Sequence, residues 1–173
     1  MSGDRVGFIS DTHGRYVMTQ RLVDMLVEFE VDTVVHLGDM DDEYVVEMFD
    51  CDQFEFKALY GNHDRPRKPI YEAVAEVGEH LGNESLLYFG NQQFFVFHGY
   101  SPERAEAVAE YPNGIRYVVH GHSHEARRVR TENGDVLCPG VASAWLYDTA
   151  EDIWSWVTLD EEAVMVERRV SED

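Results

Sequence analysis

Short apolar runs alternate with helical segments through the first part of the chain, and this alternation restricts the fold more than any other feature. The runs at 6–10, 33–37 and 54–60 have the length and side chains of buried strands. Residues 17–29 place apolar side chains at helical spacing, and 41–49 are expected to form a short second helix. Because strand–helix–strand connections return the chain in the same direction, this part predicts a parallel sheet.

The second half carries turn signals that are typical of hairpins. Pairs of apolar runs flank Gly90-Asn91, Asn133-Gly134 and an acidic turn at 160–162. A helix is expected to begin at Ser101-Pro102-Glu103, and Pro66 to Pro69 is predicted to be a loop. We therefore expect an α/β (α+β) fold in which a parallel beginning continues into an antiparallel end. Two packed sheets with helices outside would satisfy both halves.

The charge of the chain excludes some classes of partner. With 34 acidic and 14 basic side chains, the net charge is −20, which disfavours extended nucleic-acid binding and adhesion to anionic lipid. The acids are dispersed, and 12 of the basic residues are arginine, as in cytoplasmic proteins of salt-accumulating archaea. We expect a halophilic source, the alternative being a merely acidic mesophilic protein.

The length and the apolar content predict one globular domain over 1–173. The first residues do not resemble a secretory signal, and no apolar run is long enough to span a bilayer, so we expect a cytoplasmic protein without a secretory leader or a membrane partner. Cys51 and Cys138 have no zinc-type spacing and are expected to be buried free thiols.

Five glycine-flanked segments, each at the end of an expected strand, carry side chains that can bind metal ions. They are Asp11-Thr12-His13-Gly14, Gly38-Asp39, Gly61-Asn62-His63-Asp64, His98-Gly99 and Gly121-His122-Ser123-His124. The carboxyl ends of strands are where sites form in α/β sheets, and glycine lets the backbone approach a ligand closely. Carboxylate, amide and imidazole ligands suit manganese, iron, zinc or cobalt. They exceed the needs of one ion and indicate two, which could clamp a phosphate.

These five segments, in this order and at this spacing, resemble those of the calcineurin-like metallophosphoesterase superfamily. The short chain is similar to the compact YfcE-like phosphodiesterases of archaea and bacteria. The resemblance covers nearly the whole sequence and implies a four-layer fold, with two packed mixed sheets flanked by helices. It also implies hydrolysis of a small phosphodiester by attack of a metal-bound hydroxide. Two divalent ions are implied as cofactors, with Mn²⁺ expected and Ni²⁺, Fe²⁺ or Zn²⁺ as alternatives.

Carried over residue by residue, the resemblance implies seven metal ligands. Asp39 bridges both ions, and the remaining ligands are Asp11, His13 and His124 for one ion and Asn62, His98 and His122 for the other. His63 is expected to protonate the leaving-group oxygen, and Asp64 to orient His63. Many compact members have cysteine at the position of His63, so the histidine favours acid catalysis here.

Other interpretations remain open at this stage. The chain could be a phosphomonoesterase acting on a protein or a metabolite, or a non-catalytic scaffold like the related retromer subunit. A polynucleotide nuclease is disfavoured because no broad basic track exists. The cluster Arg127, Arg128 and Arg130 is expected to balance nearby acids, or otherwise to contact a second phosphate or a partner. We expect the remaining histidines to be core residues: His36, His80 and His120.

Overall fold

The computed structural model describes residues 3–64, 68–99, 101–159 and 165–169. Their strands form two sheets, which we call sheet A and sheet B. Sheet A has seven strands in the order β12 (Met165–Arg169), β11 (Ile153–Leu159), β10 (Ser143–Asp148), β1 (Arg5–Ile9), β2 (Thr33–His36), β3 (Glu55–Leu59) and β4 (Glu79–Gly82). Sheet B has five, in the order β5 (Glu84–Phe89), β6 (Gln92–Phe97), β7 (Tyr117–His120), β9 (Asp135–Cys138) and β8 (Arg127–Arg130).

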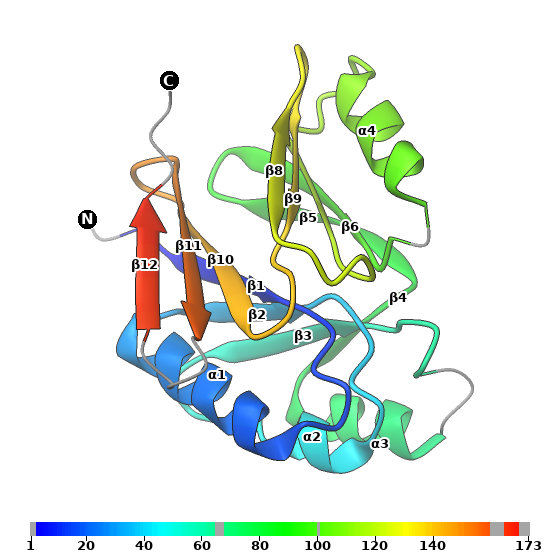
Figure 1. The fold of residues 1–173 in the computed structure, drawn as a ribbon, viewed down its shortest axis with the longest axis vertical. Coiled ribbons are helices and arrows are strands. Elements are labelled where there is room, and N and C mark those ends of the chain that lie inside the picture. Colours follow the sequence, from blue (N-terminus) through cyan, green and yellow to red (C-terminus); the bar gives the residue numbers. More distant parts are fainter. Residues whose placement is uncertain (1–2, 65–67, 100, 160–164, 170–173) are drawn as a thin grey trace.

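Four helices cover the outer faces of these sheets. The helices α1 (Tyr16–Glu28), α2 (Glu43–Glu47) and α3 (Lys68–Val77) lie along sheet A, and α4 (Pro102–Glu110) lies against sheet B (Figure 1). Three buried apolar clusters fill the spaces between these layers. One joins α1–α3 to sheet A, the second fills the space between the sheets, and the third joins sheet B to α4. The predicted four-layer fold is confirmed.

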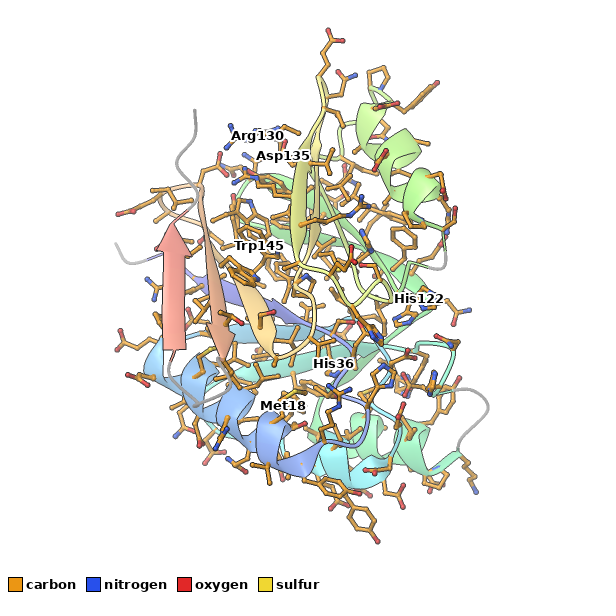
Figure 2. The ribbon with its side chains drawn as sticks, in the orientation of Figure 1. Met18, His36, His122, Arg130, Asp135 and Trp145 are labelled. Atoms are coloured by element: carbon orange, nitrogen blue, oxygen red, sulfur yellow. The ribbon has the colours of Figure 1, made fainter. Side chains whose placement is uncertain are left out.

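The space between the sheets is filled largely by aromatic side chains. Phe8 of sheet A stacks on Phe94 of sheet B with ring centroids 5.7 Å apart, and Trp154 packs against both. Trp145 lies in the same layer (Figure 2). Burying this apolar area is the main force that holds the two sheets together.

The strand directions predicted from the sequence are found in sheet A and only partly in sheet B. β1 to β4 run parallel, while β10, β11 and β12 are antiparallel to their neighbours. Two of the three predicted hairpins exist as β5–β6 and β8–β9. The third turn, 160–162, lies outside the described residues, and the strands on either side of it, β11 and β12, pair antiparallel as expected. The expectation of an antiparallel end is nevertheless wrong for β6, β7 and β9, which run parallel. For β6 and β7 the reason is that α4 connects them, and such a crossover returns the chain in the same direction. β9 follows β8 and is antiparallel to it, so β9 runs in the direction of β7.

The segment around Pro69 also differs from the prediction. Lys68 and Pro69 begin α3 instead of a loop, whereas Pro66 lies outside the described residues. Proline is tolerated in the first turn of a helix because the amide there needs no partner within the helix. Ile70, Ala73 and Val74 form the buried face of α3 at helical spacing.

Cys138 is buried and Cys51 is half-buried, and both are free thiols. Among the described residues, each helix is too short or too polar to cross a bilayer.

Candidate metal centre

The loops that follow β1, β2, β3, β6 and β7 meet at one end of the two sheets. Three groups of potential metal ligands lie there, each with its ligand atoms within 4.8 Å of one another. They are Asp11, His13 and His124; Asp39, His98 and His122; and His13, Asp41 and His63. The first two groups unite six of the seven ligands expected from the sequence. Figure 2 shows His122 at this end of the molecule.

The carboxylate of Asp39 lies between the first two groups. Its Oδ2 is 3.2 Å from Nε2 of His98 and 3.7 Å from Nε2 of His13, and its Oδ1 accepts the backbone N–H of His63. Burial alone would raise the pKa of Asp39, but the hydrogen bonds from His98 and His63 outweigh it and lower the pKa to about 2. The carboxylate is therefore ionised near neutral pH, with one oxygen facing both groups.

Asp11 shows that the site suits a cation. Its side chain is fully buried, and Oδ2 accepts hydrogen bonds from the Ser10 hydroxyl and the His122 backbone. Its Oδ1 is buried without a hydrogen-bond partner and lies 3.3 Å from Nε2 of His124 and 3.5 Å from Nε2 of His13. A buried carboxylate oxygen without a partner is costly, and a divalent ion among these atoms would remove that cost. The donor set thus fits the ions that the sequence predicts.

Hydrogen bonds orient two of the imidazole rings. Nδ1 of His98 donates to the backbone carbonyl of Leu37 at 2.8 Å, which leaves Nε2 as the nitrogen that faces Asp39. Nδ1 of His13 lies 3.2 Å from each carboxylate oxygen of Asp41, so its Nε2 also faces inward. Fixing the outer nitrogen in this way is how proteins set the tautomer of a metal-binding histidine.

The backbone at the ligands has an unusual conformation. Five of the nine non-glycine residues with positive φ among the described residues are predicted ligands: Asp11, His13, Asp39, His122 and His124. Such conformations cost on the order of 1–3 kcal/mol each and concentrate at functional sites. The neighbouring glycines let the backbone of one loop lie against side chains of the next loop. A Cβ at Gly61 would collide with Oδ1 of Asp39, and one at Gly121 with the Ser10 hydroxyl.

Asp64 does not have the position that the sequence predicts. It is fully buried, and its carboxylate accepts four backbone N–H groups, those of Gly61, Asp39, Met40 and Asp41, at 2.7–3.1 Å. The expected contact with the ring of His63 is replaced by this clamp, which joins the loop after β2 to the loop after β3. The carboxylate beside His63 is Asp41, whose Oδ1 lies 3.4 Å from Nδ1 of His63.

Sequence reasoning missed Asp41 as a site residue, although the signal was present. Asp41 and Asp42 follow Asp39 closely, but they stand at the start of the helix predicted over 41–49, where an aspartate is expected to cap the helix. Asp42 indeed caps α2 by accepting the backbone N–H of Val45. The backbone of Asp41, with φ of 75°, lets its side chain face His13 and His63 instead.

Two further predicted site residues lie on the exposed side of the centre. The side chain of His63 is 51% exposed, and its ring centroid lies 4.9 Å from that of His13. Asn62 is exposed in the same loop, and its role as a ligand stays a prediction. Both residues are therefore on the side from which a substrate would enter.

Two other histidines are buried beside the centre. Nδ1 of His36 accepts the backbone N–H of Gly38, and Nε2 donates to the hydroxyl of Thr12, which ties the first two loops together. Burial lowers the pKa of His36 to about 3 and that of His120 to about 4. Both are core residues as predicted, whereas His80 is only half-buried, beside Tyr60.

Two of the three arginines of β8, Arg127 and Arg128, are balanced by acids, as the first of the two interpretations predicted. Arg128 donates to buried Asp135, with the closer contact at 2.7 Å, and Arg127 pairs with Glu106 at 3.0 Å. Figure 2 shows Arg130 and Asp135 at the end of the β8–β9 hairpin far from His122. This cluster therefore stabilises sheet B.

Comparison with known proteins agrees with this geometry. The family model for the calcineurin-like phosphoesterase superfamily domain matches residues 5–162. Phosphodiesterase MJ0936 of Methanocaldococcus jannaschii is 28% identical over 147 residues, which cover 82% of this chain and 86% of the relative.

Two solved structures share the fold. A novel archaeal phosphodiesterase superimposes with a TM-score of 0.81 at 22% identity, covering 90% of this chain and 99% of the other. Vps29 of Entamoeba histolytica complexed with Zn²⁺ gives a TM-score of 0.71 at 16% identity, covering 96% and 98%. Since the family match spans almost the whole chain, this protein belongs to the calcineurin-like phosphoesterase superfamily, and its enzyme class is that of metal-dependent phosphoric ester hydrolases.

Proposed function

We propose that this protein is a phosphodiesterase that uses two divalent metal ions. The observation that carries the proposal is the position of Asp39, with one carboxylate oxygen between two groups of inward-facing imidazoles. One ion would be held by Asp11, His13 and His124, the other by Asn62, His98 and His122, and Asp39 would contact both. When bound, the ions would neutralise the phosphate and lower the pKa of a coordinated water molecule.

His63 is the residue that we assign to proton transfer. It lies on the exposed side of the centre, and its Nδ1 faces the carboxylate of Asp41. The carboxylate of Asp41 would stabilise the positive charge of the ring beside Nδ1, so the proton given to the leaving oxygen would be the one on Nε2. Asp41 is thus a positioning residue for His63 and also fixes the ring of His13.

Asp41→Asn is expected to lower kcat by about tenfold or more, since the amide no longer stabilises the imidazolium of His63. It should also weaken metal binding by about 10–100-fold through His13. The measurements are the pH profile of kcat at saturating manganese and a metal titration. Asp42→Asn is the control because Asp42 caps α2 instead. Equal effects of both substitutions would show a merely structural role for Asp41.

The substrate class is tested with a pair of chromogenic esters. Bis-nitrophenyl phosphate is expected to be hydrolysed with a higher kcat/KM than nitrophenyl phosphate under added manganese. The named activity of the relative from Methanocaldococcus jannaschii supports this direction. Preference for the monoester would instead indicate a metabolite or protein phosphatase. If metal-loaded protein hydrolyses neither ester, the scaffold function becomes the better interpretation.

We also propose that the protein works in a salt-rich cytoplasm. Its net charge of −20 makes the folded chain repel itself, and screening shortens to about 3 Å at about 1 M salt. The thermal unfolding midpoint is therefore expected to rise between about 0.1 M and about 1 M sodium chloride. Full stability in dilute buffer, with no gain in salt, would contradict this proposal.

A further inference from the structure

The loop that follows β7 contributes to both groups of ligands around Asp39. His122 lies in the group that contains Asp39, and His124 lies in the group that contains Asp11. Both histidines have a positive φ, 69° for His122 and 61° for His124. Since such a backbone persists only where its surroundings hold it, the contacts that hold this loop affect both proposed ions at once.

The backbone of Gly121 anchors the loop. Its N–H donates to the carbonyl of His98 at 2.9 Å. Its carbonyl accepts the N–H of Ser123 at 2.9 Å and lies 2.8 Å from Nδ1 of His120. The ring of His120 is buried in sheet B, so it meets this carbonyl from the side away from the ligands.

Arg127 determines which nitrogen of His120 carries the proton. Nε2 of His120 lies 3.2 Å from Nε and 2.9 Å from Nη2 of Arg127. A guanidinium group only donates hydrogen bonds, so Nε2 is the acceptor and the proton of the neutral ring is on Nδ1. Nδ1 therefore donates to the carbonyl of Gly121. In the other tautomer, Nδ1 would instead present a lone pair to that carbonyl oxygen, and the two would repel each other.

The register of sheet B brings these two side chains together. Val119 of β7 pairs with Leu137 of β9, and Cys138 of β9 pairs with Arg127 of β8. His120, Cys138 and Arg127 thus lie in one row across three strands. Each is two residues from a member of the apolar cluster beneath α4, so the row faces α4.

Glu106 on α4 completes this chain of contacts. Its carboxylate accepts from Nη1 of Arg127 at 3.0 Å, while Nε and Nη2 of the same guanidinium face His120. A planar guanidinium that is bound on two edges keeps a fixed orientation. The orientation of Arg127 is therefore set by α4 and passed on to the ring of His120.

We infer that Arg127 is a positioning residue for both metal ions, acting through the tautomer of His120 and the carbonyl of Gly121. The inference deepens the proposed function, on which it rests. Arg127 fixes the point from which the chain turns to His122 and His124, and so the direction of the two imidazoles. The contact of Arg127 with Glu106 then has a second consequence besides the stability of sheet B.

Replacing the guanidinium tests this inference by metal binding alone. Arg127→Met keeps an apolar stem but removes the donors to His120 and Glu106. It is expected to weaken manganese binding by about 10–100-fold in a calorimetric titration of metal-free protein. Arg127→Lys retains a donor for Nε2 of His120 and should recover most of this loss. Arg128→Met is the matched control, since Arg128 lies on the opposite face of β8 and pairs with Asp135. It should leave manganese affinity unchanged.

A second background separates the proposed route from a general loosening of β8. His120→Asn provides a side-chain amide that can donate to the carbonyl of Gly121 without help from Arg127. In this background, Arg127→Met should change manganese affinity far less than it does in the wild type. Urea unfolding in high salt identifies the variants that are folded, and Arg127→Lys provides the comparison if Arg127→Met is not.

Three results would overturn the inference: wild-type affinity in Arg127→Met, an equal loss in Arg128→Met, or an equal loss with and without His120→Asn. Wild-type protein that binds a single manganese ion would contradict the two-ion proposal instead. The same comparison of variants would still decide whether Arg127 positions the loop at Gly121.

Discussion

Replacing Asp39 by Ala is expected to lower kcat on bis-nitrophenyl phosphate by about 10³-fold, because the carboxylate faces both groups of ligands. Bound metal, measured on protein purified without chelator, should fall in parallel. The loss should persist at high manganese concentration, since a single remaining ion cannot hold the substrate from both sides.

Asp39→Asn separates the charge of this side chain from its shape. The amide can still accept the backbone N–H of His63, so the loop should fold, but it lacks the negative charge that two cations share. Because the pKa of Asp39 is lowered to about 2, the carboxylate is ionised throughout the neutral range, and this substitution removes a full charge at every pH tested. Activity that persists in both variants would refute the two-ion mechanism.

Replacing Asp64 by Ala is expected to lower the free energy of unfolding by roughly 3–5 kcal/mol, as when a buried charge network loses one partner. Four backbone N–H groups would lose their acceptor in a place that water does not reach. The measurement is urea unfolding in high salt. Metal affinity should also fall, because Asp64 holds together the loops that carry Asp39 and Asn62.

Asp135→Ala provides the matched control for this effect. Asp135 is also a buried carboxylate, but it accepts hydrogen bonds from Arg128 at the far end of sheet B. Its loss should destabilise the fold by a comparable amount while leaving metal affinity unchanged in protein that remains folded. If Asp64→Ala likewise leaves metal affinity unchanged, the clamp does not support the centre.

Much of this architecture could be predicted because residue chemistry and local spacing carry it. Apolar runs defined the strands, Asn-Gly and Gly-Asn pairs marked the hairpins, and glycine-flanked acids and histidines identified the loops of the centre. The parallel strands of sheet B were missed because strand direction depends on where a connection packs, which a single sequence does not specify. Pro69 concealed α3 because proline is tolerated both in loops and in the first turn of a helix.

The orientation of side chains within the centre was harder to predict. The carboxylates of Asp41 and Asp64 follow their glycines in similar ways, yet one faces the imidazoles and the other is enclosed by backbone amides. The difference follows from backbone angles, since Asp41 has a positive φ. Aspartate and histidine adopt left-handed conformations more often than most residues, but residue type alone does not say which of them in a chain will do so.

The ligands of each proposed ion come from both sheets. Asp11 and His13 follow β1 of sheet A, while His124 follows β7 of sheet B; Asp39 follows β2, while His98 and His122 follow strands of sheet B. Each ion would therefore act as a cross-link between two layers that are otherwise joined at this end by apolar packing and by a few hydrogen bonds, such as that of His98 with the carbonyl of Leu37. Metal occupancy would then add to the cohesion of the two sheets, so that removal of the ions would abolish catalysis and also lower the stability of the fold.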